Sequence, residues 1–596
     1  MMKSPSSSSN NSNYKLEDEK SLKEELWLPI LMGEQVMKMA HEAKSSKVEC
    51  HELATKVEIL CESLRCVMRV VEANHKSLND KPIRRMVREV IKNLERTFAL
   101  VRWCKKQGGI GALKHVLTMR NNGDFRKVWN LLESCNGDMM WLLNIFKSKG
   151  TDLSLPPIAC IDPILAWVWT YIYTLQLGNP SDRADAATKL GSIAKSNDRN
   201  KFIIVEEGGV LPILKVLKDS SFPDCQIAAS NALVNIVSDD DQQRVVRFLV
   251  SNHAVPVIVQ ALSGGLFRVR VSVANLVSAM ADQDLFASEE FILAKVTKPL
   301  VSLLSVDTVK IEGVESRNSI HSLVLNMSEV GYDGRGREAD QSPELRNDVK
   351  VSCAKALWKL SKGCLLACRK MTETKGLLCL AKIIESTKGE LRLNCLMAVM
   401  EIAAVAESNA ALRRNAFRST APAAKAVLDE LLKVVREESD SKFLIPAIKS
   451  IGSLARNFPG KVPHVLGPLV AHLRNRDLNV AREVVVALEK FVCEDNYNRV
   501  DHSKIIFELD GIPKLMRLLQ VNDGQQVYSL KLLCYLALNV GNSKVLEQEH
   551  VLISLEKFAH SVLPQNPDLK ELFRKAIDHL TLFQPGVHYY RQPLGL

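Results

Sequence analysis

Aromatic side chains are scarce in this sequence: they make up 6% of the 596 residues, whereas hydrophobic residues in total make up 46%. A composition rich in aliphatic residues and poor in aromatic ones is typical of a folded helical protein and argues against a largely disordered chain. Catalytic motifs are missing as well, since the sequence has no Gly-x-x-x-x-Gly-Lys-Ser/Thr loop, no Gly-x-Ser-x-Gly elbow and no His-Glu-x-x-His helix. We therefore expect no enzyme, no cofactor and no small-molecule substrate.

Long apolar runs are also missing. The most apolar stretch, residues 153–177, is interrupted by three prolines and an aspartate, so that only about a dozen residues run unbroken where a membrane-spanning helix needs roughly 20. We expect a buried linker helix in residues 151–180 that docks an N-terminal domain onto the next segment. The Ser- and Asn-rich start of the chain has no apolar signal core, so residues 1–21 are expected to be a disordered leader.

The 14 cysteines are scattered, mostly at apolar positions of expected helices. This distribution indicates reduced core residues of a cytosolic or nuclear protein. Cys364 and Cys368 are four residues apart, as two metal ligands on one helix can be. No histidine lies near them and the spacing of a zinc ribbon is missing, so we expect helix packing and no metal. The seven tryptophans, Trp27 among them, are also expected to pack between helices.

What the sequence does contain is a repeat. The run Glu-Glu-Gly-Gly-Val-Leu-Pro-Ile-Leu-Lys-Val-Leu (residues 206–217) returns in looser form around Pro256, Pro299, Pro468 and Pro513, and without the proline around Cys379 and Glu430. From Pro212 onward the copies are 44, 43, 80, 51, 38 and 45 residues apart. A period of about 40 to 47 residues is typical of armadillo or HEAT units.

The Gly-Gly pair and the proline of the first helical turn favour armadillo units, with the glycines in a tight turn between units. A second apolar helix is expected after each copy. The step of 80 is interpreted either as two units with an insertion or as one missed unit. A mobile insertion is expected at residues 307–346.

The N-terminal part shows strong helical periodicity. Apolar residues recur every three or four positions in residues 48–72 and 82–104, and flanking helices are expected near 29–43 and 125–146, the last one broken around Gly137. The expected fold class is all-α, with an N-terminal four-helix bundle followed by an armadillo-type α-solenoid. The expected domains are a leader (1–21), the bundle with a basic third helix (22–150), the linker helix (151–180), the solenoid (181–582) and a tail (583–596).

Positive charge is concentrated in the expected bundle. Residues 1–150 contain 26 basic and 18 acidic residues, a net charge of +8 out of +11 for the chain. On a helix with about 100° per residue, eight cations lie opposite the apolar stripe of the third helix. They are Lys81, Arg84, Arg85, Arg88, Lys92, Arg96, Arg102 and Lys106. This face is either an ordinary solvated surface or, as we prefer, a binding surface for anionic lipid. Nucleic acid is not expected, because no nucleic-acid-binding module is present.

Candidate partner-binding positions follow from the repeat. Armadillo proteins that carry nuclear-import cargo place an asparagine on each third helix. The equivalent positions here are Ser192, Asn235, Ser278, Lys359, Glu401, Ser453, Lys490 and Tyr535. Only one of them is asparagine, so a regular ladder that clamps an extended peptide is not expected. We expect protein partners to bind through this groove over several units.

Several runs together resemble one family. They are residues 42–53, 81–86, 138–143, 162–169, 183–187 and 206–209. In this order they resemble the plant armadillo-repeat-only family, from about residue 22 to the C-terminus. The resemblance implies a non-enzymatic scaffold in polarised cell growth that binds anionic lipid of the plasma membrane and contacts Rho-type GTPases and their regulators. The implied location is cytoplasmic and peripheral at the plasma membrane, with the nucleus also open. The alternative is a nuclear adaptor in import, transcription or ubiquitin ligation.

Overall fold

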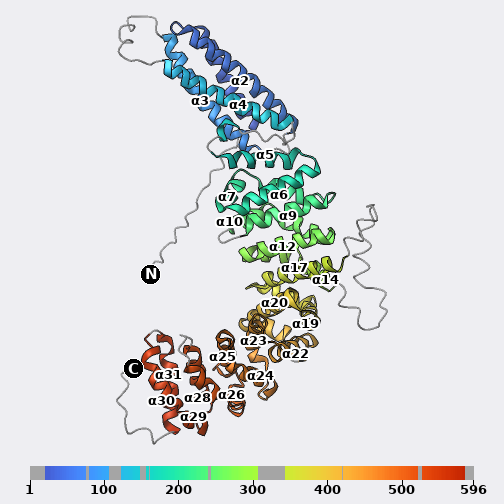
Figure 1. Ribbon diagram of the computed structural model, residues 1–596, viewed down its shortest axis with the longest axis vertical. Helices are drawn as coiled ribbons and strands as arrows, with labels where there is room; N and C mark the ends of the chain where they lie inside the picture. Colours follow the sequence, from blue (N-terminus) through green and yellow to red (C-terminus); the bar gives the residue numbers. More distant parts are fainter. Residues whose placement is uncertain are drawn as a thin grey trace, which may run out of the picture. The chain divides into compact units, whose positions relative to one another are not determined.

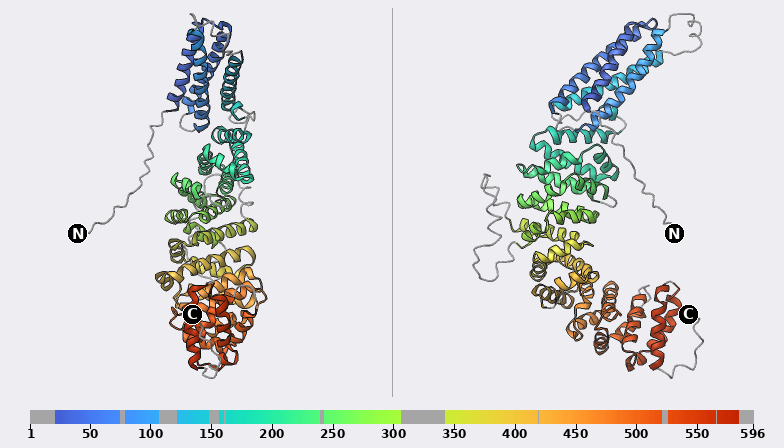
Figure 2. Two further views of the ribbon diagram at one scale, coloured as in Figure 1. Left: turned by 90° about the vertical axis from the view of Figure 1, so that its left-hand side faces the viewer. Right: turned by 180° about the vertical axis from the view of Figure 1, so that it is seen from behind.

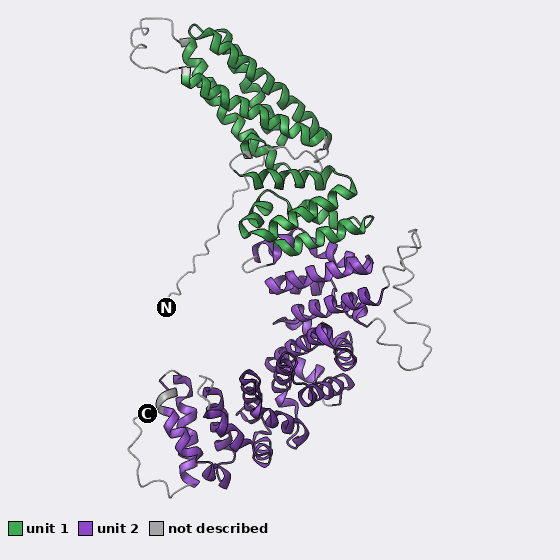
Figure 3. Cartoon of the chain, in the orientation of Figure 1, with its two compact units in different colours: residues 1–236 green, residues 237–596 purple. Residues whose placement is uncertain are grey.

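The structure is a computed structural model. It describes residues 21–74, 79–106, 122–147, 156–159, 162–238, 243–305, 342–418, 420–520, 526–564 and 566–583. These residues form helices and no strand (Figure 1), as the all-α prediction requires. The chain divides into two compact units, residues 1–236 and 237–596, which are described separately below (Figure 3). Most of the expected leader, insertion and tail lies outside the described residues.

Four long helices open the first unit. They are α1 (Leu22–His41), α2 (Lys47–Asn74), α3 (Lys81–Lys106) and α4 (Asn122–Lys147). Helix α1 packs on α2 and α3, and α4 packs on the same two helices (Figure 2). The apolar stripes seen in the sequence face inward, so Leu53, Leu60, Leu64, Ile83 and Leu94 are buried. A capping box between Ser21 and Glu24 begins α1.

Two expected helix boundaries in this region were wrong. Helix α1 begins seven residues before Pro29, which lies buried inside the helix. Helix α4 continues without a break through Gly137. A Cβ atom at Gly137 would lie 2.8 Å from the Cγ atom of Pro157 in the short 3-10 helix η2 (Pro157–Ala159), so the glycine permits close packing rather than ending the helix.

Helices α5 (Pro163–Leu177) and α6 (Pro180–Ser196) follow. The expected linker helix corresponds to α5, which packs on α4, α6 and α8 (Val210–Lys218). Its Trp169 and Tyr173 are fully buried, and Trp169 stacks at a tilt on Trp141 of α4 with the ring centroids 6.1 Å apart. Thus α5 is apolar on nearly all sides because it is covered on nearly all sides.

From α7 onward the helices follow a three-helix pattern, which is that of armadillo units. The first helices are α7 (Asp198–Glu206), α10 (Gln243–Ser251), α13 (Leu285–Leu293), α18 (Leu365–Glu373), α21 (Ala410–Ala416), α26 (Arg499–Glu508) and α29 (Lys544–Gln548). The second helices are α8, α11 (Ala254–Gly264), α14 (Thr297–Leu304), α19 (Gly376–Ser386), α22 (Pro422–Glu437), α24 (Pro463–Ala471), α27 (Gly511–Leu519) and α30 (Val551–Val562). The third helices are α9 (Pro223–Val237), α12 (Phe267–Gln283), α17 (Pro343–Ser361), α20 (Gly389–Ser408), α23 (Ser441–Ser453), α25 (Leu478–Val492), α28 (Gln526–Asn539) and α31 (Lys570–Phe583).

Short 3-10 helices complete the pattern. They are η3 (Ala455–Asn457), which takes the place of a first helix before α24, η4 (His472–Arg474) and η5 (Pro567–Leu569). In the second unit each third helix from α12 to α31 packs on the next. Figure 1 shows α20, α23 and α25 on the inner side of the curve of this unit, with α19, α22 and α24 outside.

The sequence interpretation of the repeat needs three corrections. The step of 80 residues runs from α14, the second helix of one unit, to α19, the second helix of the next unit. Only α17 and α18 are described between them, besides residues 306–341, so no described helix supports an extra unit there. Pro468 lies inside α24, which begins at Pro463. The Gly208–Gly209 turn joins α7 to α8 within one unit rather than two units.

The turn between first and second helices has a recurring geometry. Gly208 has a φ of 80°. The corresponding turns of other units use a non-glycine residue in the left-handed region, and these residues are His253, Lys295, Lys375, Asp510 and His550. A glycine motif in the sequence therefore detects only one of the turns that share this geometry.

None of the described helices is by itself long and apolar enough to cross a bilayer. Helices α10 and α11 meet the length and composition requirement only together, and they are bent by 81°.

Candidate functional site

The third helices of the second unit form a surface lined with paired charges. Asp282 at the end of α12 accepts hydrogen bonds from Lys359 of α17 (2.7 Å) and from Lys362, which directly follows α17 (3.2 Å). Partial burial raises the pKa of Asp282, but the two lysines outweigh this effect and hold the pKa below its usual value. The Lys359 ammonium also lies 4.4 Å from the ring centroid of Trp358. These side chains connect two neighbouring repeats across the predicted groove.

The row of charges continues over the next third helices. Lys490 of α25 reaches Glu407 of α20 at 2.6 Å, and its ammonium lies 3.4 Å from the hydroxyl of Ser453 on the helix between them. Lys449 of α23 lies 3.7 Å from Glu483 of α25. The surface from α20 to α25 is therefore bridged by ion pairs between different repeats.

Two acidic positions and a tyrosine extend this surface. Burial raises the pKa of Glu401 on α20, although the positive charges of Lys362, Lys359 and Lys449 oppose the shift. Glu489 of α25 accepts from Lys531 of α28 at 2.8 Å, and the contact raises the pKa of Lys531 against the effect of its burial. Tyr535 lies one turn further along α28, where burial raises the pKa of its hydroxyl.

The eight predicted groove positions therefore differ in accessibility. Lys359, Glu401, Lys490 and Tyr535 lie on the charged surface described above, whereas Ser278 and Ser453 are buried. In the first unit, Ser192 is exposed and bonds to Thr188 of its own helix, and the Asn235 amide donates to the carbonyl of Gly191 at 3.2 Å. Asn235 thus ties α9 to α6.

Sequence spacing missed the acidic partners Asp282, Glu407 and Glu489. They do not occupy the expected asparagine position, and only the packing of successive third helices brings them within reach of the lysines. Asp282 and Glu407 follow the predicted positions of their own helices by four and six residues, and Glu489 directly precedes Lys490.

The basic helix α3 was predicted as one anion-binding face, and the structure divides it. Arg84 pairs with Glu25 of α1 and with Asp80 at 2.7 Å. Arg85 pairs with Glu207 at 2.7 Å, and the Lys81 ammonium donates to the carbonyl of Glu206 at 2.6 Å. These three cations thus contact other segments of the first unit.

Glu207 is the centre of this contact. Its second carboxylate oxygen accepts from the indole nitrogen of Trp169 at 2.8 Å, and its main-chain carbonyl accepts from the Asn79 amide. Tyr173 donates to the Asn79 carbonyl at 3.2 Å. The start of α3, helix α5 and the α7–α8 turn are thereby joined in one polar network, which we call the Glu207 latch.

The remaining predicted cations of α3 differ from Lys81 and Arg85 in their partners and not in exposure. Arg88, Lys92, Arg96 and Arg102 are exposed, as are Lys81 and Arg85. Lys92 lies 3.4 Å from Glu89, and Arg96 donates to the Asn93 side-chain oxygen at 3.2 Å. The side chain of Lys106 lies outside the described residues. Four of the eight predicted cations are thus exposed without an ion pair to another helix among the described residues.

Trp27 departs from the expectation for tryptophans. It is 49% exposed on α1, whereas Trp141 and Trp169 are buried as expected.

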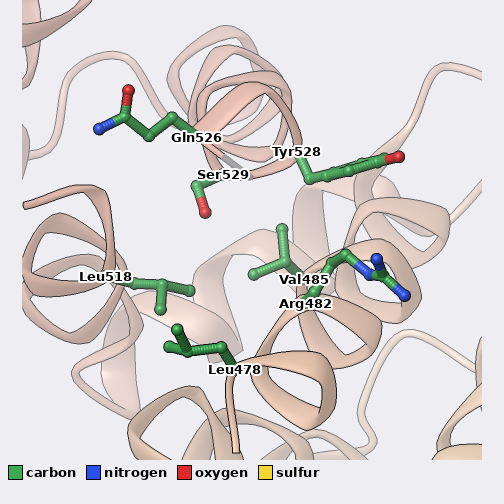
Figure 4. A pocket seen from close by; sticks show the side chains of 7 residues that line it. All are labelled: Leu478, Arg482, Val485, Leu518, Gln526, Tyr528 and Ser529. Carbon is green, nitrogen blue, oxygen red and sulfur yellow. The ribbon is translucent and has the colours of Figure 1, made fainter. Parts of the chain in front are cut away.

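Small-molecule and metal sites have little support in the described part of the chain. The cavity between α25, α27 and α28 has a volume of about 10 Å³ (Figure 4). This is at the lower limit for a single water molecule. A wider hollow of about 330 Å³ lies beside Arg414 and Arg418, before α22. No group of three or more His, Cys, Asp or Glu residues among the described positions could hold a metal ion.

A family model described as a domain of unknown function (DUF7792) matches residues 23–147, which cover nearly all of α1 to α4. No curated protein matches the chain.

Among solved structures, an engineered protein is similar with 20% identity over 70% of this chain and 99% of its own, at a TM-score of 0.46. A computationally designed armadillo repeat protein for modular peptide recognition is 18% identical over 48% of this chain and 98% of its own, at a TM-score of 0.36. A designed armadillo repeat protein in complex with the peptide (KR)4 is 17% identical with the same coverage and TM-score. At these scores the likenesses carry no conclusion about ligands, and the armadillo-type solenoid is defined by its own three-helix units.

Proposed function

We propose that this chain is a non-enzymatic scaffold that holds protein partners on the third-helix surface of its second unit, from α12 to α28. The observation that carries the proposal is the row of charge pairs that bridges successive third helices, including Asp282 with Lys359 and Glu407 with Lys490. Repeat proteins bind partners along such extended surfaces rather than in a single deep pocket. A lysine or a carboxylate in such a pair can give up its intramolecular partner and bind an opposite charge on the partner protein. This favours binding of partners with a complementary charge pattern.

The proposed partners are Rho-type GTPases and their regulators, in polarised cell growth. This finer assignment is supported by the resemblance of the chain to the plant armadillo-repeat-only family. The same proposal locates the protein in the cytoplasm and peripherally at the plasma membrane, where exposed cations of the first unit such as Arg88 contact anionic lipid. A membrane-bound scaffold raises the local concentration of its partners, so a modest affinity suffices.

The competing function is a nuclear adaptor, in import, transcription or ubiquitin ligation. An import-type groove needs asparagines free to clamp a peptide backbone, and the Asn235 amide is already bonded to Gly191. This observation favours the scaffold over an import adaptor.

The test compares two double variants of the full chain. The first, Lys359→Ala with Lys490→Ala, removes two cations from the third-helix surface. The matched control, Lys382→Ala with Lys425→Ala, removes two exposed cations from the second helices α19 and α22. Binding of a purified Rho-type GTPase, loaded with GDP or with a non-hydrolysable GTP analogue, is measured by biolayer interferometry.

We expect the first variant to weaken binding at least about fivefold, since surface charge pairs contribute up to about 1 kcal/mol each, and the control to leave it unchanged. Equal affinities for both variants would show that this surface is not the binding face. Failure of the unmodified chain to bind any Rho-type GTPase would remove that partner class and promote the nuclear adaptor.

A further inference from the structure

Helix α1 presents large apolar side chains to solvent. Trp27, Leu28 and Leu31 are 49%, 46% and 40% exposed. They share the outward face of α1, opposite the buried residues Ile30 and Gly33. Soluble proteins expose single apolar residues routinely, but a tryptophan and two leucines grouped on one helical turn indicate a contact surface.

Arginines flank this ridge on both sides. On the α2 side, Arg65 pairs with Glu34 of α1 at 2.8 Å, and Arg69 follows one helical turn later. On the α3 side, Arg84 pairs with Glu25 of α1, and Arg88 follows one turn later. Arg69 and Arg88 are both exposed, and within the described residues neither forms a salt bridge. The ridge is thus apolar at its centre, with one exposed arginine that forms no described salt bridge on each side.

The carboxylates near the ridge are largely occupied. Glu34 is paired with Arg65, Glu25 with Arg84, and Glu72 with Lys23 at 2.7 Å. Glu24 is held in the capping box at the start of α1. Glu24 keeps its negative charge, and Arg84 is shared between Glu25 and Asp80. Arg69 and Arg88 are therefore the cations beside the ridge that no described carboxylate pairs with, and they can contact the phosphates of an anionic surface.

We propose that the α1 ridge inserts into the interface of an anionic bilayer, with Trp27, Leu28 and Leu31 among the headgroups and Arg69 and Arg88 on the lipid phosphates. This inference rests on the membrane part of the proposed function and identifies the surface that carries it. A fluid bilayer accepts a convex ridge without a complementary pocket, tryptophan favours the membrane interface, and arginines add electrostatic attraction to anionic lipid.

The cations of α3 differ in their distance from the α1 ridge. Counted around the helix from Arg84, Arg88 lies about 40° away, whereas Lys92 and Arg96 lie about 80° and 120° away and so farther from α1. If the ridge is the membrane contact, Arg88 must matter more than Lys92 and Arg96. If α3 alone is the contact, the three cations must matter equally.

The experiment is flotation of the full chain with vesicles of phosphatidylcholine and phosphatidylserine (70:30), and with phosphatidylcholine vesicles alone, in 0.15 M salt. The apolar variant is Trp27→Gln with Leu28→Gln and Leu31→Gln. Its control is Met140→Gln, which replaces an apolar residue that is 45% exposed on α4, a helix that does not adjoin α1 in the bundle. The charge variant is Arg69→Gln with Arg88→Gln, and its matched control is Lys92→Gln with Arg96→Gln.

We expect the apolar variant to lower partitioning at least about tenfold. The loss of two arginines is expected to lower it about 25-fold, at about fivefold each, and both controls are expected to lower it clearly less. Circular dichroism and thermal melting must show each variant folded, which is expected because all substituted side chains are exposed.

Normal binding by the apolar variant would overturn the proposal, as would an equal loss in both charge variants; the latter result would leave lipid binding by α3 intact. If the unmodified chain did not bind anionic vesicles, the proposal would also be overturned, and the ridge would be interpreted as a surface for a protein partner. None of these results depends on GTPase binding by the third helices, so failure of the scaffold proposal is detected separately.

Discussion

Replacing Glu207 with alanine should loosen the contact between α3, α5 and the α7–α8 turn. The carboxylate of Glu207 accepts from Trp169, which is fully buried, and from Arg85, whose side chain is 49% exposed. A buried indole N–H left without an acceptor costs about 1–3 kcal/mol. Loss of the half-exposed ion pair adds at most about 1 kcal/mol. The expected destabilisation of this contact is therefore about 1–4 kcal/mol.

Hydrogen exchange measured by mass spectrometry reports this change locally. If α3 and α5 open together, a loss of about 1–4 kcal/mol accelerates exchange of their protected amides roughly 5- to 1000-fold. Glu207→Gln keeps an oxygen acceptor and should have a smaller effect. The matched control is Glu206→Ala, because the side chain of Glu206 is exposed and only its main-chain carbonyl accepts from Lys81. Exchange in Glu207→Ala as slow as in this control would refute the latch.

Three further predictions concern stability. Burial raises the pKa of Asp138 to about 7, although the N–H of Ile158 opposes the shift, so the first unit should lose up to about 4 kcal/mol as pH rises from about 4 to 7 and then level off. Asp138→Asn should flatten that profile in chemical denaturation, and an unchanged slope would contradict the assignment. Gly452→Ala should destabilise the second unit by about 1–3 kcal/mol, because the new Cβ atom would lie 2.9 Å from the Cα of Ala487. Gly467→Ala, which meets nothing within 4 Å, is its control, and equal melting temperatures would argue against the close approach. Lys375→Gly should raise the melting temperature, since it relieves a left-handed residue with a φ of 60° that costs about 1 kcal/mol; a lower melting temperature would show that the Lys375 side chain contributes more.

The sequence by itself determined the class of fold. Apolar residues recurring every three or four positions predict the helices, and a period of about 40 to 47 residues predicts the repeated units. These signals are local: they depend on which face of a helix is buried, and every unit must bury a similar face against its neighbours. The same local signals failed where a residue has an unusual neighbour, as at Gly137, which fits against Pro157, and at Pro29, which is buried inside α1.

Only the tertiary structure decided which charged residues are paired with other parts of the chain. Lys81, Arg84 and Arg85 appear in the sequence as part of one cationic face, but Glu25, Glu206 and Glu207 come from distant positions and occupy them. In the same way Asp282 and Glu407 meet lysines about 80 residues away. Helical periodicity predicts the direction in which a side chain points from the axis of its own helix. Its ion pairs and its exposure depend on the other helices that pack against that helix. For that reason Trp27, expected in the core, lies on the surface, and the ridge beside Arg88 could not be read from the sequence.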